Sequence, residues 1–175
     1  MSDASDIPGL SDDRRDDVRD RPLGETLLPQ WLSREVVTCE QASLAKGVPL
    51  RNELKTLVLR TSDGHRAVHI RGDHRLSLRA VKRFLALREA HLLSAVELSN
   101  IGLAPGIVCP FLPPVWYMHQ LVAASVLDLE FATTNNGTIT GYFVFDPQLL
   151  LDVPHVDVGE FEVATMGPGG LTHEG

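Results

Sequence analysis

Two short segments of the sequence carry residues whose types and spacing could do chemistry. Lys55 stands at the opening of an apolar strand pattern, where its ammonium would be a fixed point charge for a phosphate or a carboxylate. The second segment is the Gly106–Pro110 loop, with the sequence GIVCP, which directly follows Pro105. Glycine lets another group approach the backbone, and the prolines restrict the chain, so the loop amides could polarise a carbonyl or hold a water. Each feature alone also has an ordinary interpretation, a solvated lysine and a surface turn.

The patterns of well-known catalytic and metal sites are missing from the sequence. It has no GxSxG, P-loop, HExxH or GxGxxG motif. His65 and His69 lie four residues apart, but on a predicted hairpin this spacing does not bring two ligands together, so we expect no metal and no cofactor. Cys109 has no His or Asp near it in sequence, and a small buried cysteine is its more common role. Because Cys39 and Cys109 form neither a disulfide framework nor a zinc pattern, we expect a reducing, cytoplasmic setting.

A central hairpin is predicted to position Lys55. Residues Leu54–Arg60 carry apolar side chains on both faces, which is typical of a strand in the middle of a sheet. The turn Ser62-Asp63-Gly64 leads into Arg66–Arg71, whose alternation predicts the partner strand.

The rest of the sequence predicts short helices and strands in irregular alternation. The predicted helices cover residues 23–34, 41–46, 77–87 and 94–100, with one further turn after Pro147. The predicted strands cover residues 36–37, 126–133, 138–145 and 155–163, with an Asn136-Gly137 turn before the third segment. This mixture excludes a simple doubly wound sheet and favours an α+β (mixed α/β) fold.

Composition predicts a globular protein with an uneven charge distribution. The 175 residues are 43% hydrophobic and 22% charged, enough for one domain, and no stretch resembles a membrane span or a signal peptide. We expect an acidic disordered tail at 1–22, a single domain at 23–164 and a flexible tail at 165–175. Residues 39–91 hold eleven Lys and Arg against five Asp and Glu, whereas 92–175 hold no Lys or Arg. A positive face would attract polyanions, and an uneven solvated surface is the alternative.

Four segments, in this order, resemble the YbaK family and the related insertion domain of bacterial prolyl-tRNA synthetases. They are EQASLAKGVPLRNELKTLVLR, IRGDHRLSLRAVKRFL, GLAPGIVCPF and NNGTITGYFVFDPQLL. The resemblance runs from about Val36 to Leu151, and its most specific parts are Lys55-Thr56-Leu57, Arg71-Gly72-Asp73-His74 and Gly106–Pro110. It implies a mixed, partly barrel-like β-sheet flanked by helices.

The resemblance also implies an aminoacyl-tRNA deacylase, which hydrolyses the ester between a wrong amino acid and its tRNA. Since these residues include no synthetase catalytic domain, the chain resembles the free-standing, trans-editing type. Its partners would be the acceptor end of aminoacyl-tRNA and an aminoacyl-tRNA synthetase, with no membrane. Lys55 would hold the phosphate of the terminal adenosine, and the loop backbone would position the ester carbonyl and the attacking water. The implied catalytic residues are Lys55, Gly106, Ile107, Val108, Cys109 and Pro110.

Further residues are predicted to form the substrate pocket and the tRNA surface. Strand position alone suggests Thr38, Leu57 and Ile70 for the pocket. The resemblance adds His119 and Gly137, at places where family members often carry an aspartate and a GKH segment; these departures leave the amino acid that is removed open. The predicted phosphate contacts, for which a solvated helix face is the alternative, are Arg75, Arg79, Lys82 and Arg83.

Two other functions stay open from the sequence. A non-catalytic module of the same fold could bind tRNA or a synthetase, although the presence of both Lys55 and the Gly106–Pro110 loop argues against it. Alternatively, Cys109 could serve a hydrolase that acts on a small ester or amide.

Overall fold

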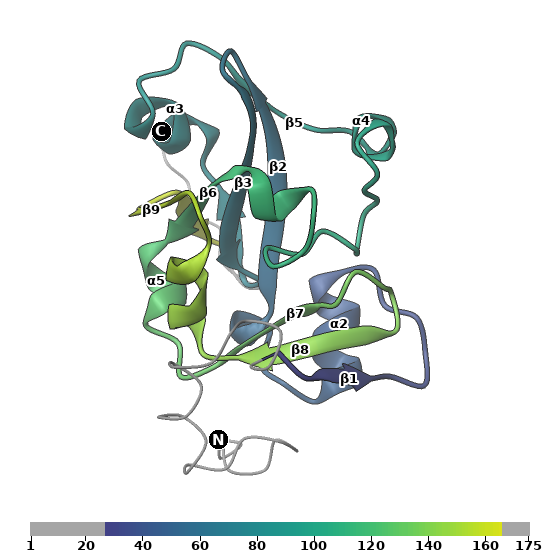
Figure 1. The fold of residues 1–175 in the computed structure, drawn as a ribbon. Helices are drawn as coiled ribbons and strands as arrows, with labels where there is room; N and C mark the ends of the chain where they lie inside the picture. The colour runs from purple at the N-terminus through teal and green to yellow at the C-terminus, as the bar shows by residue number, and fades with distance from the viewer. Residues whose placement is uncertain (1–26, 166–175) are drawn as a thin grey trace, which may run out of the picture.

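A five-stranded mixed sheet lies at the centre of the computed structural model, which describes residues 27–165 (Figure 1). Its strands, in spatial order, are β5 (Ala90–Leu92), β2 (Leu54–Thr61), β3 (Gly64–Arg71), β6 (His119–Ala123) and β9 (Val156–Gly159). Strands β2 and β3 form an antiparallel hairpin, whereas β6 runs parallel to β3, and β9 parallel to β6. The predicted central hairpin is therefore confirmed. The predicted tail at 1–22 lies outside the described residues.

A second sheet lies beside the start of β2. It has the order β1 (Pro29–Trp31), β8 (Gly141–Phe145) and β7 (Ala132–Asn135), all antiparallel. A single parallel bridge between Glu53 and Thr133 joins this sheet to the start of β2. A small antiparallel pair, β4 (His74–Leu76) with β10 (Glu162–Ala164), completes the strands of the described chain. The mixed α/β architecture with flanking helices is the predicted fold class.

Short helices and 3-10 turns connect these strands. Their bounds are α2 (Cys39–Lys46), α3 (Leu78–Phe84), α4 (Ala95–Asn100) and α5 (Ala124–Leu127), with 3-10 turns η3 (Leu50–Asn52), η4 (Val115–Tyr117) and η5 (Pro147–Asp152). Thr38 begins α2 through a capping box with Gln41, and Gly47 ends it in the left-handed conformation at φ 68°. Ser77 and Ser94 are the N-caps of α3 and α4, which lie within the predicted helices at 77–87 and 94–100. None of the helices within residues 27–165 is long and apolar enough to cross a membrane.

The two faces of the β2–β3 hairpin pack into different hydrophobic clusters. Leu59, Val68 and Ile70 belong to the larger cluster. Val58 and Ala67, on the other face, belong to the smaller one together with residues of α4 and the loop that follows it. Packing on both faces explains why the central residues of β2, Leu57–Leu59, are all apolar.

Two elements near the N-terminus differ from the prediction. The described part of the predicted helix at 23–34 is extended, and Pro29–Trp31 pairs with Gly141–Phe143 as β1. Apolar spacing suggested a helix, but Pro29 has no backbone N–H to donate within one, and pairing with β8 wins. Val36 and Val37 form no strand, because this segment leads into the Thr38 cap.

The C-terminal strands also differ in their bounds. The predicted strand at 126–133 is wrong in its first half, where α5 ends at Leu127, and β7 begins only at Ala132. The predicted strand at 155–163 is two strands, β9 and β10. Strand β6 is not predicted from the sequence, because its five residues, HQLVA, begin with two polar side chains and are too few to show a period.

Candidate active site

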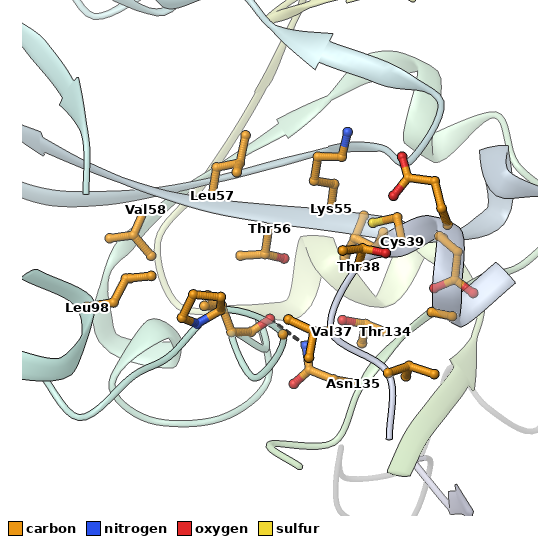
Figure 2. A pocket seen from close by; sticks show the side chains of 18 of the residues that line it. Val37, Thr38, Cys39, Lys55, Thr56, Leu57, Val58, Leu98, Thr134 and Asn135 are labelled. Carbon is orange, nitrogen blue, oxygen red and sulfur yellow. Dashed lines mark hydrogen bonds between the residues drawn. The ribbon is translucent and has the colours of Figure 1, made fainter. Parts of the chain in front are cut away.

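A pocket of about 330 Å³ opens at the unpaired part of β2 (Figure 2). Strand β5 pairs only with Leu59–Thr61, and the bridge to β7 lies at Glu53, so no strand of the described chain pairs with the outer edge of residues 54–57. The start of α2, the end of β7, α4 and the loop before Cys109 surround this edge. The lining residues are Val36–Glu40, Ala42, Lys46, Glu53–Val58, Leu92, Leu93, Leu98, Pro105, Gly106, Val108, Thr134, Asn135 and Gly141.

The open edge of β2 presents backbone groups to the pocket. The carbonyl of Val58 accepts a hydrogen bond from the Leu93 N–H, on the side away from β3. Because backbone groups alternate along a strand, the N–H and C=O of Thr56 point to the same side. A ligand in the pocket can therefore hydrogen-bond to the β2 backbone as an additional strand would.

Lys55 lies on one face of β2 and Thr56 on the other (Figure 2). The Lys55 ammonium donates to the carbonyl of His74 at 2.9 Å, so its position is fixed by the turn after β3. Because both residues line the pocket, the pocket wraps around the edge of the strand. An elongated ligand can contact the ammonium at one end and the Thr56 side of the strand at the other.

The turn that supports Lys55 requires a glycine at position 72. A Cβ on Gly72 would lie 2.5 Å from the Leu50 carbonyl oxygen, and the Gly72 N–H donates to the Glu53 carbonyl at 2.7 Å. Arg71 holds Asp73 through two hydrogen bonds, of 2.9 and 2.6 Å, across this turn. The Arg71-Gly72-Asp73-His74 segment thus forms a rigid support beneath the lysine.

The Gly106–Pro110 loop forms the opposite wall. Gly106 has φ +85°, and a Cβ there would lie 3.0 Å from the Val37 Cα, so this position needs glycine for both conformation and space. Asn135 Nδ2 donates to the Val108 carbonyl at 2.8 Å, as Figure 2 shows, and ties the loop to the end of β7. Gln120 Nε2 donates to the Pro110 carbonyl at 3.0 Å. Amide side chains therefore hold the loop at its middle residue and at its last residue.

A buried ion pair lines the pocket beside α2. Lys46 Nζ lies 2.9 Å from Glu53 Oε2, and both side chains are 3% exposed. Burial lowers the pKa of Lys46 and raises the pKa of Glu53, and their mutual attraction opposes both shifts. Lys46 also donates to Thr133 Oγ1 and lies 4.7 Å from the centre of the Tyr142 ring. These contacts join α2 to the second sheet and fix one end of the pocket.

Both cysteine thiols are held in the neutral form. Burial raises the pKa of Cys39 to about 11, and the nearby Glu53 carboxylate contributes to the rise. Burial raises the pKa of Cys109 to about 12, although backbone hydrogen bonds from Phe111 and Leu112 oppose it. A thiol that stays protonated is a poor nucleophile at neutral pH. The Cys109 side chain is 1% exposed and is absent from the pocket lining.

The structure brings together five of the residues named from the sequence and separates the others. Lys55, Gly106, Val108, Thr38 and Leu57 all line the pocket. The other three residues of the loop, Ile107, Cys109 and Pro110, do not line it.

Three residues predicted for the pocket lie outside its lining. Ile70 pairs with Lys55 across the hairpin, but its side chain is fully buried in the larger cluster. His119 starts β6, where its Nε2 lies 2.5 Å from Asp157 Oδ2 at the start of β9. Gly137 occupies the β7–β8 turn at φ +86°, where a Cβ would meet Leu112. Strand position, on which the Ile70 prediction rests, does not report which face of the sheet borders the pocket, and His119 and Gly137 are implied by the resemblance alone.

The four predicted phosphate-binding residues lie on β4 and α3. Arg75, Arg79 and Arg83 are exposed, and Lys82 is half-buried. Figure 1 places α3 at the upper end of the central sheet and α2 at its lower end. The basic helix is therefore separated from the α2 side of the pocket.

Several lining residues were not predicted from the sequence. Val37, Cys39, Thr56, Leu98 and Asn135 come from separate elements. Only Thr56 carried a signal, since it follows Lys55 in the strand. The others reach the pocket through tertiary packing, which local sequence patterns do not predict.

Comparisons with known proteins identify the family and the fold. The model of the aminoacyl-tRNA editing domain family matches residues 33–153. The solved structure of the hypothetical protein APE2540 is 24% identical, with a TM-score of 0.72 over 79% of this chain and 92% of that chain. A protein described as a proposed trans-editing enzyme for prolyl-tRNA synthetase is 22% identical, with a TM-score of 0.71 over 89% of this chain and 99% of that chain. No curated protein sequence matches.

At these identities the solved structures establish the fold, and the family match spans most of the described chain, including both walls of the pocket. The chain belongs to the aminoacyl-tRNA editing domain family.

Proposed function

We propose that this protein is a trans-editing hydrolase that removes the amino acid from mischarged aminoacyl-tRNA. The observation that carries the proposal is that one pocket is lined by Lys55 and by the glycine loop on the opposite wall. Membership of the editing family supports the substrate class. The second structural relative is described as acting in trans-editing for prolyl-tRNA synthetase, which supports action on a separate substrate tRNA.

The proposed chemistry needs binding and polarisation more than a strong nucleophile. An aminoacyl ester is already activated, and backbone N–H groups aimed at the developing oxyanion contribute on the order of a hundredfold in rate per donor. Lys55 holds the phosphate of the terminal adenosine, while the Gly106–Pro110 loop positions the ester carbonyl and the attacking water. The free hydroxyl of the terminal ribose assists the proton transfer.

An elongated 3′ terminus suits the shape of the pocket around the edge of β2. The phosphate lies on the Lys55 face, and the ester lies on the Thr56 face, which carries the loop. The ribose between them crosses the unpaired edge, where the Thr56 backbone offers a donor and an acceptor.

The size of the pocket favours a small amino acid. A volume of about 330 Å³ is at the low end of the range for small-molecule sites. Because one methylene group is worth only about 1–3 kcal/mol of discrimination, selectivity depends on the walls formed by residues such as Leu57 and Val108.

The protonated thiols argue against a cysteine hydrolase. Burial raises the pKa of both Cys39 and Cys109, so neither supplies a thiolate at neutral pH. A non-catalytic binding module would have the same fold as a deacylase. Only a measurement of turnover distinguishes the two.

A deacylation assay with tRNA charged with Ala, Cys, Ser or Thr tests the proposal. We expect amino acid release from at least one of these, a loss of about tenfold or more in Lys55→Ala, since a charge-assisted contact is worth about 1.5–3 kcal/mol, and activity retained in Cys109→Ser. Release from none of the charged tRNAs would identify a binding module. Loss of activity in a folded Cys109→Ser variant would identify a thiol enzyme.

A further inference from the structure

A buried chain of hydrogen bonds connects the pocket wall to the end of the glycine loop. Thr56 Oγ1 lies 2.8 Å from His69 Nδ1, and His69 Nε2 lies 2.6 Å from Gln120 Oε1. Gln120 Nε2 in turn donates to the carbonyls of Pro110 and Val115, at 3.0 and 2.9 Å. The chain crosses three adjacent strands, β2, β3 and β6, and only Thr56 at its start lines the pocket.

The direction of every hydrogen bond in this chain follows from Gln120. Its Nε2 donates to two carbonyls, so its Oε1 is the atom that faces His69. An amide oxygen can only accept, and His69 Nε2 therefore carries the ring proton. Nδ1 is then an acceptor, and the Thr56 hydroxyl donates to it. With its proton committed in this way, the Thr56 oxygen can offer only lone pairs to a ligand in the pocket.

Burial keeps this direction constant. His69 and Gln120 are both fully buried. Burial lowers the pKa of His69 to about 4, so the ring stays neutral at physiological pH, and one tautomer satisfies both neighbours. A fully satisfied polar chain of this kind is rigid, because every alternative leaves a buried group without a partner.

Packing alone does not account for these two residues. Positions 69 and 120 lie on the central strands β3 and β6, among apolar neighbours such as Ala67, Leu121 and Val122. Apolar side chains of similar size would fill such positions without the cost of desolvating an imidazole and an amide. What His69 and Gln120 add is a fixed link between Thr56 and Pro110.

We propose that His69 and Gln120 are positioning residues of the editing site. They hold the Thr56 oxygen as a hydrogen-bond acceptor at the pocket wall. It can accept from an N–H or O–H group of the bound aminoacyl-adenosine or from the attacking water. They also hold the Pro110 end of the loop at a fixed distance from β2. This inference rests on the proposed function, since it assigns these residues to the same reaction, in which they act through Thr56 and the loop.

Two substitutions at His69 separate the two ends of the chain. In His69→Gln the new amide can still donate to Gln120, but the Thr56 hydroxyl loses its acceptor. In His69→Asn the shorter amide can accept from Thr56, but Gln120 Oε1 loses its donor. Since small misplacements at a reacting centre cost up to about a hundredfold, we expect His69→Gln to lower kcat by roughly tenfold or more with little change in KM.

A double-mutant cycle with Thr56→Val provides the decisive readout. If His69 acts through the Thr56 hydroxyl, removing that hydroxyl in the His69→Gln background costs little further activity, although it is costly in the wild type. Thr61→Val is the matched control on the same strand. This variant also removes a threonine hydroxyl, one that donates to the Gly64 carbonyl, but Thr61 does not line the pocket, and we expect its kcat to be unchanged.

The steady-state kinetics are measured below the unfolding midpoint of each variant. Additive effects of Thr56→Val and His69→Gln, or a folded His69→Gln variant within about twofold of the wild-type kcat, would overturn the inference. If His69→Gln does not fold, the inference is tested by NMR of the wild type, which reports which ring nitrogen of His69 carries the proton. The inference requires the proton on His69 Nε2 at neutral pH, and a proton on Nδ1 contradicts it. A wild-type protein that releases amino acid from no charged tRNA contradicts the proposed function itself.

Discussion

Among single residues, glycines decide how closely the two walls of the pocket approach each other. Gly106 has a positive φ and lies against Val37, which belongs to the segment before α2. Gly47, at the end of α2, also has a positive φ, but a Cβ there would meet nothing within 4 Å. The two glycines therefore share a conformational requirement and differ in whether a side chain would fit.

This difference predicts separate outcomes for Gly106→Ala and Gly47→Ala. Both substitutions place a side chain in the left-handed region, and we expect each to lower the free energy of unfolding by about 1–2 kcal/mol. Only Gly106→Ala also pushes the loop away from Val37, so only this variant should lose deacylation activity, by roughly tenfold or more. Urea denaturation and the deacylation assay check the two parts. Equal activity of the two variants would contradict the role given to the loop.

At the scale of elements, the sequence predicts the β2–β3 hairpin well and its environment poorly. Apolar residues on both faces of β2 and the Ser62-Asp63-Gly64 turn are local signals, and the hairpin follows from them. The pairing of β3 with β6 is a long-range contact with no local signal in the sequence. Because the His69–Gln120 contact depends on this pairing, it cannot be predicted from the sequence either. A histidine in an alternating strand is expected at the surface until the neighbouring strand is known.

The buried His69 predicts a specific dependence of stability on pH. Its pKa is about 4 in the folded protein and near the ordinary 6.5 in the unfolded chain. Between these values the unfolded chain binds a proton that the folded protein does not, so stability falls as the pH falls, by up to about 1.4 kcal/mol per pH unit from this group.

A comparison of the wild type with His69→Gln isolates this contribution. We expect the free energy of unfolding of the wild type to decrease more steeply from pH 6.5 to about 4 than that of His69→Gln, with the two slopes converging below that range. Urea denaturation at a series of pH values measures both slopes. Parallel slopes would show that His69 is not held neutral by burial.

For the whole molecule, the fold class and the meeting of Lys55 with the loop in one pocket agree with what the sequence predicts, and the surface for tRNA remains a prediction. The basic residues of α3 lie at the other end of the sheet from α2. A sequence reports that Arg79, Lys82 and Arg83 share a helix face, but it does not report how that face is oriented toward the pocket. Such relations depend on the packing of distant elements.

Charge reversal tests whether the acceptor stem contacts α3. Replacing Arg79 and Arg83 by Glu should raise KM for every charged tRNA and reduce the salt dependence of binding, with kcat nearly unchanged, because phosphate contacts are blind to sequence. Arg51→Glu, at an exposed position in η3 next to the start of β2, is the comparison. If Arg51→Glu raises KM and the α3 variant does not, the tRNA approaches from the pocket end and the predicted surface is wrong.

The central claim is that the 3′ end of an aminoacyl-tRNA lies across the open edge of β2, between Lys55 and the Gly106–Pro110 loop. A crystal structure with a 5′-phosphorylated adenosine that carries an alanyl group through a stable 3′-amide tests it most directly. We predict the phosphate beside the Lys55 ammonium and the amide carbonyl against the loop backbone, with the ribose at Thr56. An analogue bound elsewhere, or bound with its phosphate away from Lys55, would contradict the account.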